Sequence, residues 1–224
     1  MKIKWESRDP SEDDLIKVLK GTTTVGIKVK EGVIIASDKR ATANTFVASK
    51  RAVKTIKVTD YAVATISGLV ADGQFLVQNV RAISELYSME NERKMPIKGI
   101  AKYLTLLLRS YRPYFLLAHM IVGGIDLEGP HLFNVDFYGT LTEEDYLATG
   151  SGSPVAISVI EEGYRQDMSL DEGKLLVISG MIAALSRDSA TGDGIDLTLV
   201  SKEGVHFSSK DEVQSLIDRI GRRW

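Results

Sequence analysis

Strand-like and helix-like patterns follow one another in blocks along the 224-residue chain. Short apolar or alternating segments typical of strands are separated by pairs of longer segments with helical periodicity. The order is strands, two helices, strands, two helices, strands and one helix. A doubly wound parallel sheet would alternate strand and helix regularly. This order therefore favours antiparallel sheets with helices packed on their outer faces, an α+β layering.

The clearest helical segment spans residues 71–92, where apolar side chains recur on one face at Leu76, Val80, Ile83 and Tyr87. The other predicted helices are 96–112, 154–166, 170–186 and 211–222. The predicted strands are 22–29, 32–38, 54–59, 61–67, 115–126, 131–137, 144–150, 195–200 and 205–207. No repeat or linker interrupts the chain after residue 21, so we expect a single domain there.

Composition excludes several classes of function. The net charge of −2 gives no overall basic field for nucleic acid or an anionic membrane. The absence of cysteine excludes disulfides, thiolate catalysis and cysteine metal sites. The N-terminus lacks the apolar core of a secretory signal, and the longest apolar run, residues 115–125, is too short to span a bilayer. We therefore expect a soluble, cytoplasmic protein that binds neither nucleic acid nor membrane.

Histidines and aspartates do not form a recognisable metal motif. His119, His131 and His206 fall in predicted strands without ligand spacing, so packed or surface roles are favoured. The aspartates within residues 188–196 do not match a calcium loop. We expect neither a metal nor a cofactor.

The first predicted hairpin brings a threonine close to a carboxylate. If Val29 pairs with Val33, then Thr24 lies opposite Asp38, and Asp38 shares a face with Thr22 at one end of the hairpin. Lys54 opens the next strand, so its ammonium could join them. Taken singly, the threonine is an ordinary strand residue and the charges form a solvated ion pair. Together they could activate a threonine at a free N-terminus, whose α-amino group has an ordinary pKa of about 7.7–8.0 and can act as a base.

Six motifs, taken in order, resemble the proteasome β-subunits of the archaeal type. They are Thr22-Thr23-Thr24, Asp38, Lys54, SGLVADGQ at 67–74, TGSGSP at 149–154 and RDSATGDGID at 187–196. The resemblance covers essentially the whole chain after Gly21. It implies a four-layer αββα sandwich of the N-terminal-nucleophile hydrolase type, in agreement with the block order.

The resemblance also implies the roles of individual residues. Thr22 would be the nucleophile and, through its amine, the base, supported by Asp38 and Lys54. The backbone N–H of Gly68 would be an oxyanion donor. The polar residues around the Thr22 amine would be Ser151, Asp188 and Thr191. The family usually has serine at the position of Thr191, but the hydroxyl is kept and we expect its role to be kept.

A substrate site follows from the same resemblance. Its members are Ala41, Thr42, Ala52, Ile56, Ile66, Val70 and Gln74. Small and branched apolar side chains favour a bulky apolar substrate residue. Thr42 is expected to bind the substrate backbone as an added strand would.

Maturation and assembly complete these expectations. A peptide nitrogen is not a base, so residues 1–21 are expected to be a propeptide removed by self-cleavage between Gly21 and Thr22, leaving 22–224 as the protease domain. The resemblance implies a threonine endopeptidase for unfolded polypeptides. It also implies partners: homologous β-subunits in a seven-membered ring, α-subunit rings and an ATP-dependent unfoldase cap.

Two other functions compete with this one. A non-catalytic ring subunit would usually lack the threonine, the lysine or the aspartate, and this chain has all three. An N-terminal-nucleophile amidase for small molecules is disfavoured by the TGSGSP and RDSATG motifs.

Overall fold

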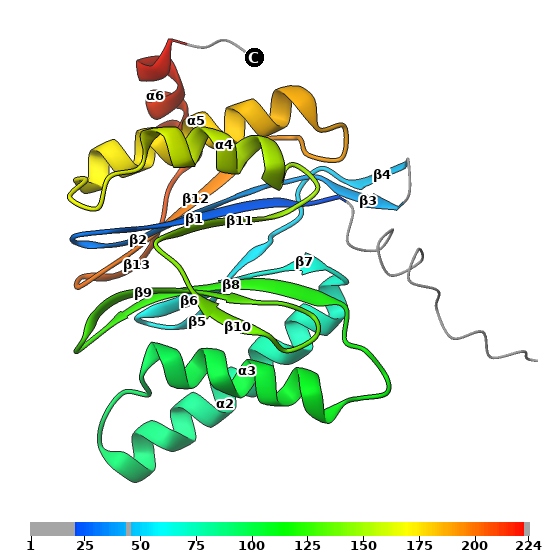
Figure 1. Ribbon diagram of the computed structural model, residues 1–224, viewed down its shortest axis with the longest axis vertical. Helices are drawn as coiled ribbons and strands as arrows, with labels where there is room; N and C mark the ends of the chain where they lie inside the picture. Colours follow the sequence, from blue (N-terminus) through cyan, green and yellow to red (C-terminus); the bar gives the residue numbers. More distant parts are fainter. Residues whose placement is uncertain (1–20, 44–45, 222–224) are drawn as a thin grey trace, which may run out of the picture.

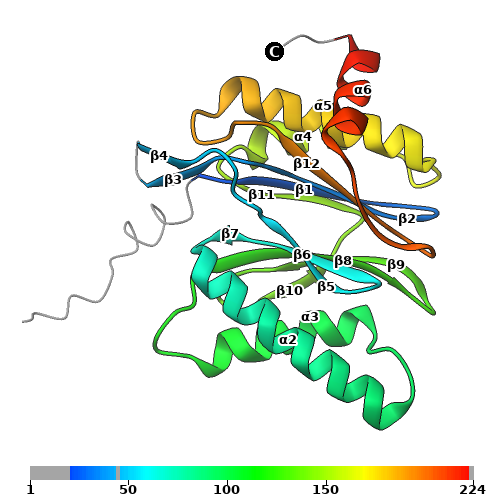
Figure 2. The ribbon, with the colours of Figure 1, turned by 180° about the vertical axis from the view of Figure 1, so that it is seen from behind.

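The computed structural model describes residues 21–43 and 46–221, and these form four layers (Figure 1). One outer layer contains α4 (Ser153–Gly163), α5 (Leu170–Arg187) and α6 (Lys210–Ile220). The opposite outer layer contains α2 (Val70–Asn91) and α3 (Ile97–Ser110). Two antiparallel sheets lie between them, and the view from behind shows the same order (Figure 2). The predicted α+β class and αββα sandwich are confirmed.

The sheet beneath α4 and α5 has the strand order β11-β1-β2-β12-β13. Its strands are β1 (Thr23–Val29), β2 (Gly32–Asp38), β11 (Tyr146–Gly150), β12 (Ile195–Ser201) and β13 (Gly204–Phe207). The second sheet has the order β10-β9-β8-β6-β5, with β7 paired to β8. Its strands are β5 (Thr55–Thr59), β6 (Ala62–Thr65), β7 (Ser67–Gly68), β8 (Ala118–Asp126), β9 (Gly129–Val135) and β10 (Leu141–Glu143). A separate hairpin, β3 (Ala41–Ala43) and β4 (Phe46–Ser49), projects at the end where β7 lies (Figure 1).

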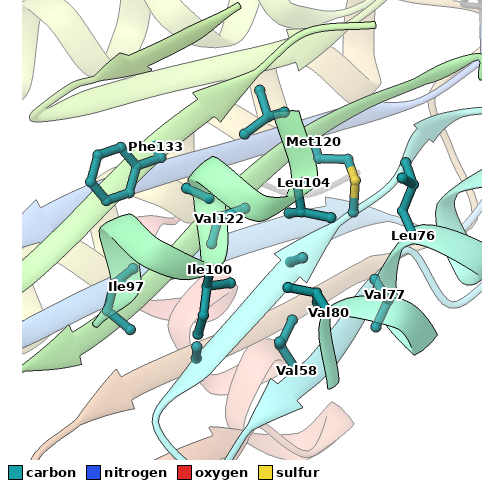
Figure 3. Close-up of a cluster of buried hydrophobic side chains, with 14 of the residues drawn as sticks. Val58, Leu76, Val77, Val80, Ile97, Ile100, Leu104, Met120, Val122 and Phe133 are labelled. Atoms are coloured by element: carbon teal, nitrogen blue, oxygen red, sulfur yellow. The ribbon is translucent and has the colours of Figure 1, made fainter. Parts of the chain in front are cut away.

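Apolar side chains fill the three spaces between the four layers. Because successive strand residues face opposite ways, Ile34 and Ala36 of β2 pack in the cluster beneath α5, while Val33 and Ile35 pack between the sheets. The third cluster joins α2 and α3 to the second sheet (Figure 3). Burial of the side chains in these three apolar clusters is the main favourable contribution to the stability of the fold.

Two glycines allow the sheets to approach each other. A Cβ atom on Gly26 would lie 2.9 Å from Leu132 Cδ1, and one on Gly123 would lie 2.6 Å from Ile35 Cδ1. A larger residue at either position would have to displace a buried side chain from the facing sheet.

The first hairpin differs from the predicted register. Thr24 pairs with Ser37 and Val29 with Gly32, so the prediction that Thr24 lies opposite Asp38 was wrong. The reason is the turn, which contains two residues, Lys30 and Glu31, rather than the three implied by pairing Val29 with Val33. Because side chains alternate along a strand, a shift of one residue moves every side chain of β2 to the other face of the sheet relative to its predicted partner in β1.

The other differences concern short segments and ends. β3, β4 and β10 have only three or four residues each and were not predicted. The strand predicted from Phe115 begins at Ala118. Among the residues that the structure describes, no helix is long and apolar enough to cross a membrane. The expected propeptide lies outside the described residues except for Gly21, as does the predicted end of the last helix at Arg222.

The layer between the sheets predicts a large stability effect for Leu132, which is fully buried there. Leu132→Ala should lower the free energy of unfolding by about 2–5 kcal/mol, because the facing sheet cannot collapse into the space. The control is Leu127→Ala, since the Leu127 side chain is fully exposed and its loss should change stability by less than about 0.5 kcal/mol. Urea unfolding of both variants measures this, and equal midpoints would contradict the assigned packing.

Candidate active site

Asp38 is the centre of a buried polar group at one end of the sandwich. It is the last residue of β2 and is fully buried. Its Oδ1 accepts hydrogen bonds from Lys54 Nζ at 2.6 Å and from the backbone N–H of Thr23 at 2.9 Å. Its Oδ2 accepts from the backbone N–H groups of Arg40 and Gly192, each at 3.1 Å. Four donors therefore compensate the carboxylate for its lost hydration.

Lys54 reaches Asp38 from the segment that leads into β5. Its backbone carbonyl accepts from the N–H of Ile66 at 2.8 Å, and its side chain is only 5% exposed. Burial lowers the pKa of Lys54, while the adjacent Asp38 carboxylate opposes that shift. The ammonium also donates to the carbonyl oxygen of Gly21 at 3.2 Å. The pair is thus a buried one, and not the solvated salt bridge that either residue suggests alone.

Thr22 lies next to this pair and is itself buried. Its carbonyl oxygen accepts from the backbone N–H of Ser151 at 2.8 Å. On one side, Gly21 has a φ of +127°, and a Cβ there would lie 2.1 Å from Thr42 Oγ1. On the other, a Cβ on Gly150 would lie 1.8 Å from the Thr22 carbonyl oxygen. Glycine is therefore required both at position 21, directly before Thr22, and at position 150, which faces the Thr22 carbonyl.

A second carboxylate, Asp188 at the end of α5, gathers the hydroxyl groups. Its Oδ2 accepts from Ser151 Oγ and from Thr191 Oγ1, each at 2.5 Å. Thr191 Oγ1 lies 2.6 Å from Thr23 Oγ1, which in turn accepts from the backbone N–H of Gly152 at 3.0 Å. The hydroxyl of Thr191 thus lies between Asp188 and Thr23.

Arg40 anchors the loop that follows Asp188. Its Nε donates to Asp193 Oδ2 at 2.7 Å, and its Nη1 donates to the carbonyl oxygen of Ser189 at 2.8 Å. The hydrogen bond from Arg40 lowers the pKa of Asp193. A Cβ on Gly192 would lie 2.2 Å from Arg40 Cζ, so the guanidinium packs directly on the loop backbone. The loop is thereby fixed beside both carboxylates.

The predicted oxyanion donor, Gly68, lies directly before the N-terminus of α2. Gly68 ends β7 with a φ of +115°, and Leu69 caps α2. The first amides of a helix lack partners within it, so they are suited to receive negative charge.

The three histidines all have side-chain partners. His119 forms a hydrogen bond with Asn134, and His206 forms one with Glu212. His131 contacts Asp126 and Glu143.

The predicted substrate residues come from β3, from residues 52–66 and from the first turns of α2. Ile66 is buried and packs against Gly73 of α2, while Val70 and Gln74 are exposed one turn apart on that helix. Ala52 donates its N–H to the carbonyl oxygen of Lys39. Ala41 and Thr42 lie half-buried in β3, and Ile56 half-buried in β5. Among the described residues, the buried Thr42 hydroxyl has no hydrogen-bond partner.

Four contributors were not identified individually from the sequence: Thr23, Arg40, Gly152 and Gly192. Arg40 lies two residues after Asp38, and Gly192 lies within the RDSATGDGID motif, so both were near a recognised signal. Thr23 was part of the threonine triplet, but only the contact with Thr191 reveals what its side chain touches.

Comparison with known proteins assigns the family. The model of the proteasome subunit family matches residues 18–200. The chain belongs to that family. The proteasome subunit beta 1 of Korarchaeum cryptofilum is 67% identical over 205 residues, which are 92% of this chain and all of that protein. The proteasome subunit beta of Archaeoglobus profundus is 42% identical over 209 residues, covering 92% of this chain and 96% of the relative. The proteasome subunit beta 2 of Pyrobaculum islandicum is 47% identical over 184 residues, which cover 82% of this chain and 92% of the relative.

These relatives confirm the archaeal type of proteasome β-subunit that the motifs predicted. By family, such subunits are proteases of the N-terminal-nucleophile type in the 20S core. Membership in the proteasome family also argues against the alternative of an amidase for small molecules.

The two members of the buried ion pair should differ in their effect on stability. Asp38→Ala leaves Lys54 charged without its partner and removes the acceptor of three backbone N–H groups, so it should cost at least about 3–5 kcal/mol. Lys54→Met leaves Asp38 with those three donors and should cost less. Urea unfolding of both variants gives the comparison, and a larger loss for Lys54→Met would contradict it.

A pH series tests the same assignment. Since the pKa of Lys54 is lowered on folding, the unfolded β-subunit binds more protons between that pKa and the ordinary value of about 10.4. The contribution of Lys54 to stability therefore rises with pH through that window. Lys54→Met should flatten the dependence there.

Proposed function

We propose that this β-subunit is catalytic and that its nucleophile is the Thr22 hydroxyl, exposed by self-cleavage after Gly21. One observation carries the proposal. Lys54 Nζ contacts both the Asp38 carboxylate and the carbonyl oxygen of Gly21, which belongs to the peptide bond that self-cleavage would break. A cation at that oxygen would stabilise the negative charge that develops during attack.

Self-cleavage would begin with attack of Thr22 Oγ1 on the carbonyl carbon of Gly21. The new C–O bond forms, the C–N bond breaks, and the hydroxyl proton passes to the Thr22 nitrogen as it leaves. Water then hydrolyses the resulting ester, which releases residues 1–21 with a carboxylate on Gly21 and restores the hydroxyl. Lys54 and the N–H of Gly68 would be the donors to the oxyanion.

Peptide hydrolysis would reuse the same groups. The free Thr22 amine takes the hydroxyl proton as Oγ1 attacks the substrate carbonyl, and the proton then passes to the departing amine of the product. Water hydrolyses the acyl ester and returns the enzyme to its starting state. The Lys54 charge favours the alkoxide-like state, and Asp38 keeps Lys54 protonated in spite of its burial. Ser151, Asp188 and Thr191 would orient the amine.

The substrate site would consist of residues from β3, from the segment 52–66 and from the first turns of α2. Its members are Ala41, Thr42, Ala52, Ile56, Ile66, Val70 and Gln74. With no opposing charge among them, they suit a bulky apolar side chain before the cut. Among the described residues, the Thr42 hydroxyl has no hydrogen-bond partner, which supports a role in binding the substrate backbone once Gly21 has left.

Family membership supports the proposed assembly. We place the subunit in seven-membered β-rings stacked with α-subunit rings, in the cytoplasm, with an ATP-dependent unfoldase cap delivering unfolded polypeptides. The chain would mature by loss of residues 1–21 and act as the domain 22–224.

Replacing Thr22 tests the nucleophile directly. In the assembled complex, the intact mass of the wild-type subunit should correspond to a chain beginning at Thr22. Thr22→Ala should retain residues 1–21 and hydrolyse no peptide, because it lacks the attacking oxygen. A non-catalytic ring subunit would retain residues 1–21 in both wild type and variant, and the two masses would differ only by the substitution. An active enzyme that still begins at Met1 would contradict the mechanism.

Replacing Lys54 tests the charge beside the scissile carbonyl. Lys54→Ala should lower peptide turnover by at least about a hundredfold while the subunit still assembles. Lys54→Arg should not restore it, because a planar guanidinium does not fit the position of a compact ammonium between Asp38 and Gly21. Turnover with a fluorogenic peptide measures both variants. Near-normal turnover in Lys54→Arg would mean that only a nearby positive charge is needed.

A further inference from the structure

Thr23 contacts Asp38 directly and is linked to Asp188 through Thr191. Its backbone N–H donates to Asp38 Oδ1 at 2.9 Å, and its hydroxyl lies 2.6 Å from that of Thr191, which donates to Asp188. The carbonyl at the other end of the same peptide unit, that of Thr22, accepts from the N–H of Ser151 at 2.8 Å. The peptide unit that follows Thr22 is therefore fixed at both ends.

The hydrogen bonds of the two threonine hydroxyls have only one consistent direction. Thr191 has a single hydroxyl proton, and it is donated to the Asp188 carboxylate. In the contact between the two hydroxyls, Thr23 must then be the donor and Thr191 the acceptor. The Thr23 oxygen also accepts a hydrogen bond from the backbone N–H of Gly152 at 3.0 Å. The chain of donors runs from Gly152 through Thr23 and Thr191 to Asp188.

The backbone at Gly152 packs closely against this hydroxyl. Thr23 is fully buried and Thr191 is only 2% exposed. A Cβ on Gly152 would lie 2.3 Å from Thr23 Oγ1 and 3.1 Å from Thr191 Oγ1. Gly152, the second glycine of the TGSGSP motif, is thus required by the position of the Thr23 hydroxyl, in addition to any role in the turn.

We propose that Thr23 is a positioning residue whose hydroxyl orients Thr191 and Asp188 relative to Thr22. The inference rests on the proposed function, because it concerns how Thr22 is held for reaction. Without the hydroxyl, the N–H of Gly152 loses its partner and the Thr191 oxygen loses the donor that fixes its rotamer. Since Thr23 is fully buried, it cannot contact substrate, and its loss should act on kcat and leave KM unchanged.

The test uses the full-length chain assembled with its α-subunit and compares two alanine substitutions. Thr24 is the matched control, because it is the next residue, is equally buried and has a comparable hydroxyl contact, to Thr149 at 2.7 Å. Its contacts do not include Asp188. Per subunit shown by mass to begin at Thr22, Thr23→Ala should lower kcat about tenfold or more with unchanged KM, whereas Thr24→Ala should keep kcat within about twofold.

Two further variants isolate the hydrogen bond from packing. Thr23→Ser keeps a strong hydroxyl donor and should restore kcat. Thr23→Cys is similar in shape to Thr23→Ser, but its thiol is a much weaker donor than a hydroxyl, so its kcat should remain low. This pair also decides the question if Thr23→Ala fails to assemble.

Three results would overturn the proposal: a Thr23→Ala kcat equal to that of the wild type, equal losses in Thr23→Ala and Thr24→Ala, or equal kcat in Thr23→Ser and Thr23→Cys. Failure of the proposed function would be separate, since it would be seen in the wild type as an unprocessed or inactive subunit.

Discussion

The buried ion pair of Asp38 and Lys54 joins the parts of the protein on which the site depends. Asp38 ends β2 in one sheet, while Lys54 leads into β5 of the other. The same carboxylate binds the N–H of Thr23 in β1 and that of Gly192 in the loop after α5. A buried charge is costly unless it is paired and fully hydrogen-bonded, so the positions of these segments are strongly coupled. Thr22 lies where they meet.

Under the proposed function, the same arrangement links stability to reactivity. Burial lowers the pKa of Lys54, the adjacent Asp38 carboxylate opposes that shift by favouring the ammonium, and this group donates to the Gly21 carbonyl oxygen. In low dielectric surroundings such a charge acts more strongly on a developing oxyanion than it would in water. The three apolar clusters hold the four layers together around this pair, and Gly26 and Gly123 allow the two sheets to lie close to each other.

Much of the fold was predictable from the sequence, because burial of alternate strand residues and of helix faces leaves a periodic pattern, as in Leu76, Val80 and Ile83 of α2. The hairpin register was not, since it depends on whether the turn at Lys30 has two or three residues. The candidate site residues Asp38 and Lys54 were placed near Thr22 by the hairpin argument and given roles by the resemblance, and their burial became visible only in three dimensions. Thr23 could not be found in this way, because its partner Thr191 lies 168 positions along the chain.

The central claim is that the hydroxyl of an N-terminal Thr22 is the reacting group, and covalent labelling tests it most directly. The assembled protein is treated with a peptide that carries an electrophilic C-terminal group, digested, and mapped by mass spectrometry. The account predicts one modified peptide, which begins at Thr22 and carries the label on that residue. A label on another residue, or on a peptide in which Gly21 still precedes Thr22, would contradict it.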